Sequence, residues 1–279
     1  MEAAEIKKKF VVYSIPGVER AQVRANIVYK SVDNEDLLLD AYYPAGFAFD
    51  KSLPAVLFIH GDGPKEMVQD VKDDGQYISW GRLVAASGLV GLPFNHRSAD
   101  QQLAGRVKVA EDVHDAITYV REKADELCVN KGRLCIWACS AGVPYLQEIF
   151  SAPPVFVRGM VAYYGSMDFQ QYADTIEPDT PPEEREFILQ ILKKYSLIHY
   201  LQEHPAALPP LLVAKAGQDD PIRNESIDRF ISTASSLGAQ VEYACHDSGE
   251  HGFDVLNDDG ISRSIIARTL SFMQKNLLD

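Results

Sequence analysis

Unbroken runs of hydrophobic residues recur along the chain and predict buried strands. Parallel strands are covered on both faces, so they show continuous aliphatic runs instead of an alternating pattern. Such runs occupy residues 55–60, 89–95, 133–138, 157–164 and 211–216, with a weaker candidate at 241–245. Before them, residues 23–31 and 36–43 flank a turn-rich stretch and predict an antiparallel hairpin that ends at Pro44.

Helical spacing of hydrophobic residues separates these runs. Val113, Ile117 and Val120, for example, recur at intervals of four and three residues and form one apolar stripe. Helices are expected over residues 77–87, 107–126, 142–151, 227–237 and 261–278. The alternation of strand and helix predicts an α/β fold with an eight-stranded, mostly parallel, doubly wound sheet.

One long segment, residues 168–210, interrupts this alternation. It contains a proline-bounded acidic turn at 177–182 and then a helical pattern over 183–201. Because it lies between two predicted strands, where long insertions often cover a ligand crevice, we expect a small helical cap. The alternative is a peripheral helix over the edge of the sheet. We expect a single domain over residues 1–279.

The composition of the chain indicates which kinds of partner it can bind and in which compartment it works. The 279 residues include 40 acidic and 27 basic side chains, and the formal charge of -13 disfavours nucleic acid and anionic membranes. The four cysteines match neither a zinc-ligand pattern nor a disulfide framework, so we expect reduced thiols. The N-terminus lacks the apolar run of a signal peptide, which favours the cytoplasm unless a leader has been removed.

The strongest chemical signal is Ser140, in the motif Ala-Cys-Ser-Ala-Gly between a predicted strand and a predicted helix. Small residues two positions before and after a serine allow a sharp strand-to-helix turn that exposes the hydroxyl at the carboxyl edge of a sheet. Such a turn suits a nucleophile. The alternative is a serine that merely caps a helix.

A serine hydroxyl needs a base, and the base needs an orienting acid. His251 lies in a glycine-rich loop after the last predicted strand, and we predict that it is the base. Two neighbouring residues, Asp219 and Asp220, follow the preceding strand. Asp220 is selected as the acid because Pro221 fixes the adjoining backbone, and Asp219 is interpreted as a turn residue.

A glycine-rich turn follows the first buried run, at His60-Gly61-Asp62-Gly63. Backbone N–H groups in such a turn can stabilise negative charge on a carbonyl oxygen. We expect one donor from Ala141 and a second from Gly61 or Asp62. A carboxylate at Asp62 would oppose that charge unless it points away.

Together these motifs resemble the α/β-hydrolase superfamily, in particular its dienelactone-hydrolase-like and acetyl-esterase or acylaminoacyl-peptidase-like branches. The resemblance implies an α/β-hydrolase fold in which Ser140, Asp220 and His251 form a catalytic triad, with an oxyanion turn at Gly61 and Asp62. Cys139 takes no part in this pattern and is expected to pack beneath the turn.

The resemblance implies a serine hydrolase that cleaves a small carboxylic ester, with no metal or organic cofactor. Peptidase or amidase activity on short acylated substrates is the rival, because the same triad serves both reactions. A binding protein with an idle triad is a further alternative. His96, Arg97, Tyr163 and Tyr164 follow or end predicted strands and are candidates for the substrate pocket, with structural roles as the alternative.

Overall fold

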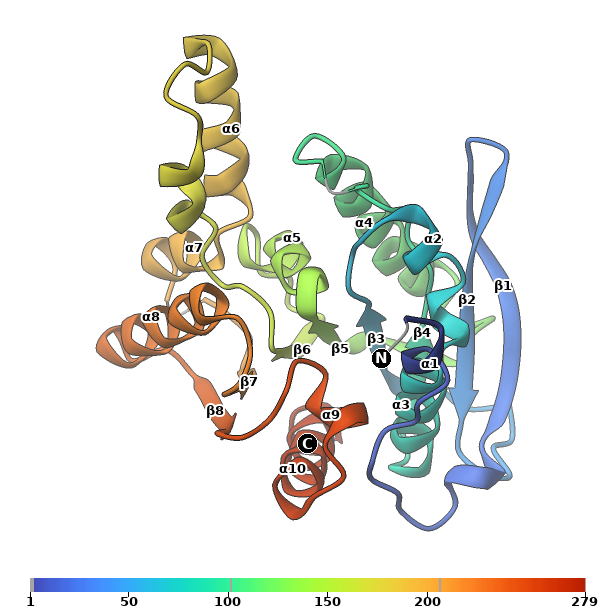
Figure 1. The fold of residues 1–279 in the computed structure, drawn as a ribbon. Coiled ribbons are helices and arrows are strands. Elements are labelled where there is room, and N and C mark those ends of the chain that lie inside the picture. The colour runs from blue at the N-terminus through green and yellow to red at the C-terminus, as the bar shows by residue number, and fades with distance from the viewer. Residues whose placement is uncertain (1–2, 101, 206, 279) are drawn as a thin grey trace.

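Eight strands form one twisted sheet in a computed structural model, which describes residues 3–100, 102–205 and 207–278 (Figure 1). Their order across the sheet is β1-β2-β4-β3-β5-β6-β7-β8. This confirms the predicted doubly wound fold. The strands are β1 (Gln22–Val32), β2 (Glu35–Tyr43), β3 (Leu53–Ile59), β4 (Val90–Pro93), β5 (Val129–Cys139), β6 (Val157–Tyr163), β7 (Leu211–Ala216) and β8 (Val241–His246).

The N-terminal hairpin is the antiparallel part of the sheet. β1 pairs with β2, and β2 pairs with β4, in antiparallel register, whereas β4, β3, β5, β6, β7 and β8 run parallel. In a parallel sheet the carboxyl ends of the strands share one edge. The loops after β3, β5, β7 and β8 therefore meet there, and these loops carry the predicted functional residues.

Helices cover both faces of the sheet (Figure 1). The α-helices are α1 (Ala3–Ile6), α2 (Lys65–Val68), α3 (Gly75–Ala86), α4 (Arg106–Glu122), α5 (Gln147–Phe150), α6 (Pro182–Lys194), α7 (Leu197–Glu203), α8 (Pro221–Leu237), α9 (Phe253–Leu256) and α10 (Gly260–Leu278). Short 3₁₀ helices are η1 (Val18–Arg20), η2 (Val71–Asp73), η3 (Ser140–Leu146) and η4 (Gln170–Thr175).

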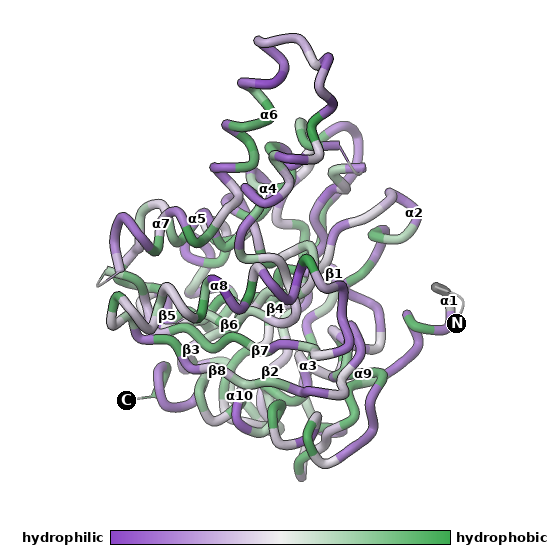
Figure 2. Tube along the Cα trace, turned by 60° about the vertical axis from the view of Figure 1, so that its left-hand side comes forward, coloured by the Kyte–Doolittle hydropathy of each residue, from purple (hydrophilic) through white to green (hydrophobic). Residues whose placement is uncertain are grey.

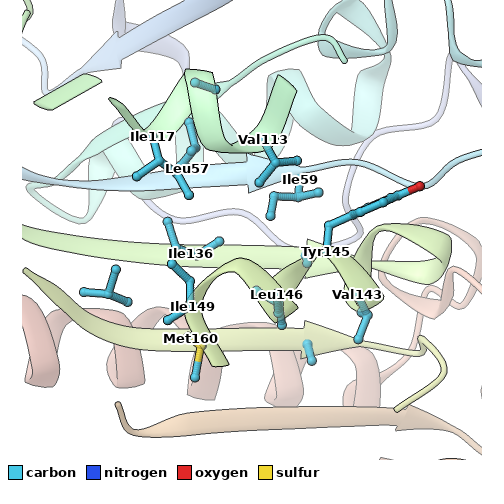
Figure 3. Packing of buried hydrophobic residues seen from close by; sticks show 14 of the residues in the cluster. Leu57, Ile59, Val113, Ile117, Ile136, Val143, Tyr145, Leu146, Ile149 and Met160 are labelled. Atoms are coloured by element: carbon cyan, nitrogen blue, oxygen red, sulfur yellow. The ribbon is translucent and has the colours of Figure 1, made fainter. Parts of the chain in front are cut away.

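Successive side chains of each central strand enter two different cores, because side chains alternate across a sheet. Leu57 and Ile59 pack with α4 residues such as Val113, and Figure 3 shows them facing one another. Phe58 lies on the other face, where Trp80 and Trp137 are fully buried. Continuous hydrophobic runs in the sequence thus correspond to strands buried on both sides.

Two predicted helices differ from the structure. The stretch 142–151 begins as the 3₁₀ helix η3 and becomes α-helical only at α5. Pro144 lies inside η3, and proline lacks the N–H that an α-helix needs there. The pattern over 183–201 forms two helices, α6 and α7, because Ser196 adopts an extended backbone between them.

The segment 168–210 contains η4, α6 and α7 and projects from the sheet, with α6 at its outer end (Figure 1). Figure 2 shows hydrophobic and hydrophilic residues alternating along α6, which has buried residues only near its C-terminal end. Within the described part of the chain, no helix is both long and apolar enough to cross a membrane.

Truncation of the core tests the packing of the sheet. Ile136 on β5 is fully buried between β3 and β6, and Ile136→Ala should lower the free energy of unfolding by about 2–5 kcal/mol through the cavity it leaves. Ile261→Ala is the matched control, since Ile261 is 47% exposed on α10. Urea denaturation measures both variants, and equal losses at the two sites would contradict the packing described.

Candidate active site

Ser140 stands at the end of β5 in a strained turn. Its φ of 53° lies in the left-handed region, which costs a non-glycine residue ~1–3 kcal/mol. The turn is packed tightly, because a Cβ on Gly142 would lie 2.3 Å from the carbonyl oxygen of His60. One on Gly165 would lie 2.4 Å from the carbonyl oxygen of Ser140. Glycine is therefore required at both positions to hold the serine in place.

Cys139, the residue before the nucleophile candidate, is buried beneath the turn, as expected. Its Sγ lies 3.2 Å from the hydroxyl of Tyr77. Burial raises the pKa of the Cys139 thiol to about 12. A thiol in that state carries almost no thiolate at neutral pH, so its nucleophilic reactivity is low.

His251 lies in the loop between β8 and α9 and faces Ser140. Its Nε2 is 2.7 Å from Ser140 Oγ, and its Nδ1 is 2.6 Å from Asp219 Oδ2. A carboxylate can only accept, so Nδ1 carries the proton and donates a hydrogen bond to Asp219. Nε2 is then the acceptor for the Ser140 hydroxyl, which is the arrangement that a general base requires.

The prediction that Asp220 contacts the imidazole was wrong, because the structure places its neighbour Asp219 there. Asp220 is the N-cap of α8, and its Oδ1 accepts the backbone N–H groups of Ile222 at 2.9 Å and Arg223 at 3.1 Å. Proline favours the first position of a helix, so the aspartate before Pro221 is the capping residue. That cap turns the Asp220 carboxylate away from His251.

Asp219 is a buried carboxylate that is held in its charged form. Burial by itself raises the pKa of Asp219, but the hydrogen bond and charge of His251, the Asp220 N–H and Arg223 outweigh it and lower the pKa. The Asp220 N–H donates to Oδ1 at 2.7 Å, and Arg223 Nη1 also pairs with Oδ1. Oδ2 is thereby left for the imidazole.

Gly61 lies against Ser140, at the position that the predicted oxyanion turn requires. A Cβ on Gly61 would lie 3.4 Å from Ser140 Cβ and 4.0 Å from the backbone nitrogen of Ala141. The Asp62 carboxylate is engaged elsewhere: Gly63 N and Ala99 N donate to Oδ1 at 2.8 and 3.1 Å, and the Tyr145 hydroxyl donates to Oδ2 at 2.9 Å. These three hydrogen bonds hold the Asp62 carboxylate in place and stabilise its charge.

His60 and His96 form a stacked pair behind this turn, with ring centroids 3.5 Å apart. Burial, and then the charge of His96, lowers the pKa of His60 well below its usual value, so the ring is neutral. Its Nδ1 lies 2.6 Å from Gly61 O, and its Nε2 accepts the backbone N–H of His96. The pair braces the loops after β3 and β4.

Three of the four predicted pocket residues have structural partners instead. His96 is buried in the stacked pair, Arg97 forms an ion pair with Asp112 at 2.9 Å, and the Tyr163 hydroxyl bonds Thr269 at 2.6 Å. They do not line the cavity described below. These three residues therefore have structural roles, which was the alternative to a place in the substrate pocket.

Tyr164, the fourth candidate, supports the imidazole. Its ring lies 4.9 Å from that of His251, and its hydroxyl donates to Asp254 Oδ1 at 2.7 Å. Asp254 also accepts from Gln76 and Trp80 at 2.9 Å each, and burial raises its pKa. This network fixes the aromatic surface on which His251 rests. Nothing in the sequence marked Asp254, three residues after His251, as part of it.

A cavity of about 540 Å³ opens beside Ser140 and Ala141. More than half of its lining comes from the segment 168–210, including Phe169, Ile188 and Leu192. Arg106 at the start of α4 and Arg223 on α8 supply the basic side chains. The insertion therefore shapes the space next to the serine. Sequence patterns did not single out either arginine, because an arginine on a helix is usually solvent-exposed.

Comparisons with known proteins agree with the fold. Residues 39–230 match the BD-FAE family. Three structures of esterase Est2 from the planctomycete Thermogutta terrifontis are similar: the native form (TM-score 0.72, 22% identity, 93% of this chain and 94% of that one covered), the butyrate-bound form (0.69, 21%, 94% and 95%) and the form phosphorylated by paraoxon (0.66, 22%, 95% and 95%). No curated protein matches the chain.

The two adjacent aspartates give a matched test of the site. Asp219→Asn should slow the reaction of Ser140 with a fluorophosphonate probe by up to ~10⁴-fold, because the amide favours the wrong imidazole tautomer. Asp220→Asn keeps a good N-cap and should react at nearly the wild-type rate. Time-resolved labelling followed by mass spectrometry measures both rates. If Asp220→Asn instead reacts slowly and Asp219→Asn reacts at nearly the wild-type rate, Asp220 is the acid.

Proposed function

The chain is a serine hydrolase of the BD-FAE family with the α/β-hydrolase fold, and we propose that it cleaves small carboxylic esters through an acyl-enzyme on Ser140. The observation that carries this proposal is the continuous hydrogen-bond path from Ser140 Oγ through His251 to Asp219. At its Ser140 end, that path reaches a cavity large enough for a small ester.

In the first half of the reaction, Ser140 Oγ attacks the ester carbonyl while His251 Nε2 takes its proton. Asp219, held as a carboxylate, stabilises the imidazolium that forms. The backbone N–H groups of Ala141 and of Gly61 or Asp62 stabilise the oxyanion, each typically worth ~3 kcal/mol in the transition state. His251 then protonates the departing alcohol, and the acyl group remains on Ser140.

In the second half, a water molecule gives a proton to His251 and attacks the acyl-enzyme. The collapse of the second tetrahedral intermediate returns the proton to Ser140 and releases the acid. The butyrate-bound and paraoxon-phosphorylated Thermogutta structures support a short acyl group and a covalently reactive site in this chain too. The segment 168–210 acts as the cap that limits the size of the substrate.

Charge and thiol state support the remaining expectations about partners and location. All four cysteines, among the residues described, are free thiols, which suits the reducing cytoplasm that we propose. The charge of -13 supports a small-molecule partner in preference to nucleic acid.

Removal of the nucleophile tests the proposal directly. Ser140→Ala should lower turnover of 4-nitrophenyl acetate by roughly 10⁶-fold, because no other group replaces the hydroxyl. Its melting temperature should stay close to that of the wild type, since the change deletes one atom at a partly exposed site. Ser271→Ala, on the exposed side of α10, is the control and should retain full activity. Activity that survives in Ser140→Ala would refute the assignment.

Ester and amide substrates separate the proposal from its rival. The same triad can cleave both bonds. We expect a higher kcat/KM for 4-nitrophenyl butyrate than for an aminoacyl 4-nitroanilide. Faster turnover of the anilide would establish a peptidase instead.

A further inference from the structure

Arg106, the first residue of α4, lines the cavity that contains Ser140 and has no hydrogen-bond or ion-pair partner for its side chain among the residues described. Its Nη1 is buried, and it forms no hydrogen bond with any of the residues described. No acidic side chain in that part of the chain pairs with its guanidinium. Leaving a charged donor desolvated and unpaired is costly, so such a group indicates a missing anionic or strongly polar ligand.

Aromatic rings hold the Arg106 guanidinium in position. Its Cζ lies 4.9 Å from the ring centroid of Phe169 and 5.9 Å from that of Tyr195. Cation–π contacts engage the flat face of the group and leave its N–H edge available. Phe169 belongs to the segment 168–210, so this segment contributes both to the cavity lining and to the placement of the charge.

The other charged residues of the cavity do not neutralise Arg106. Arg223 pairs with Asp219 and is therefore committed to the triad. Glu177 lies in the loop between η4 and α6, where it is solvent-exposed and its charge is screened by water. A free, partly desolvated arginine is unusual in a chain that carries 40 acidic residues. The uncompensated charge beside the nucleophile is thus positive.

We propose that Arg106 binds a carboxylate carried by the ester substrate, so that the preferred substrates are anionic esters. The inference rests on the proposed esterase function and names its substrate class. A planar guanidinium donates two parallel hydrogen bonds to a carboxylate, and such charge-assisted pairs are strong. The apolar side chains of Phe169, Ile188 and Leu192 fit the hydrocarbon between the ester and the carboxylate. Either the acyl or the alcohol part could carry the anion.

Two matched pairs of substrates show whether the acyl part or the alcohol part of the ester carries the anion. For the acyl side, mono-4-nitrophenyl adipate is compared with 4-nitrophenyl hexanoate; for the alcohol side, 3-acetoxybenzoate is compared with 3-acetoxytoluene. The wild type should favour the anionic member of at least one pair by kcat/KM. Arg106→Gln should lower that preference about ten- to a hundredfold, chiefly through KM, and leave the neutral ester nearly unaffected. Arg106→Lys keeps the charge and should restore part of the preference.

Arg121→Gln is the control, since Arg121 lies on the same helix and its guanidinium also covers a ring, that of Phe156 at 3.9 Å, but it does not line the cavity. It should leave both preferences unchanged. The inference is overturned if the preference for the anionic ester changes less than about threefold in Arg106→Gln. It is also overturned if kcat/KM falls equally for both members of each pair, which would indicate a structural role.

A binding experiment separates this inference from the esterase proposal. In Ser140→Ala, which cannot form the acyl-enzyme, calorimetry should show tighter binding of monomethyl adipate than of methyl hexanoate, or of 3-acetoxybenzoate than of 3-acetoxytoluene. Adding Arg106→Gln should abolish the difference. Equal affinities within both pairs overturn the role of Arg106. If the wild type hydrolyses none of these esters but Ser140→Ala still binds the anionic member of a pair more tightly, only the esterase proposal is contradicted.

Discussion

The hydrogen bond between Ser140 Oγ and His251 Nε2 joins two loops that are 111 residues apart in the sequence, and the rest of the site depends on it. It forms because β5 and β8 end at the same edge of a parallel sheet. Ser140 has a left-handed backbone conformation where it meets His251, and the strain of that turn must be offset elsewhere. The close packing of Gly142 and Gly165 against the turn, and the deep core beneath β5, supply that support.

The buried carboxylates around this hydrogen bond are stabilised by hydrogen-bond and ion-pair partners. Asp219 is kept ionised by His251, the Asp220 N–H and Arg223, whereas the Asp62 carboxylate accepts hydrogen bonds from Gly63 N, Ala99 N and the Tyr145 hydroxyl. Asp254 anchors Tyr164 under the imidazole. Asp219, Asp62 and Asp254 therefore have their partners inside the protein, whereas the buried Arg106 Nη1 forms no hydrogen bond with any described residue.

Sequence reasoning could predict the sheet and single out Ser140 and His251, which the structure brings into contact, because each has a local signal. Hydrophobic runs identified the strands, and small residues around Ser140 and glycines around His251 identified the loops. The acid could not be chosen in this way, because Asp219 and Asp220 differ only in where a helix begins. Pro221 correctly marked a fixed backbone, but the physical consequence is an N-cap at Asp220, not a contact with His251. Arg106 and Asp254 escaped notice because their significance lies in contacts between distant segments.

We propose that His251 and Asp219 activate Ser140 as the nucleophile. Rapid mixing with a short 4-nitrophenyl ester, followed by an acid quench and peptide mass spectrometry, tests it most directly. We predict a burst of nitrophenolate close to one equivalent per chain, with the acyl group on the peptide that contains Ser140 and on that residue. An acyl group on another side chain, such as Cys139, or steady turnover with no trapped acyl-enzyme under any quench condition, would contradict the account.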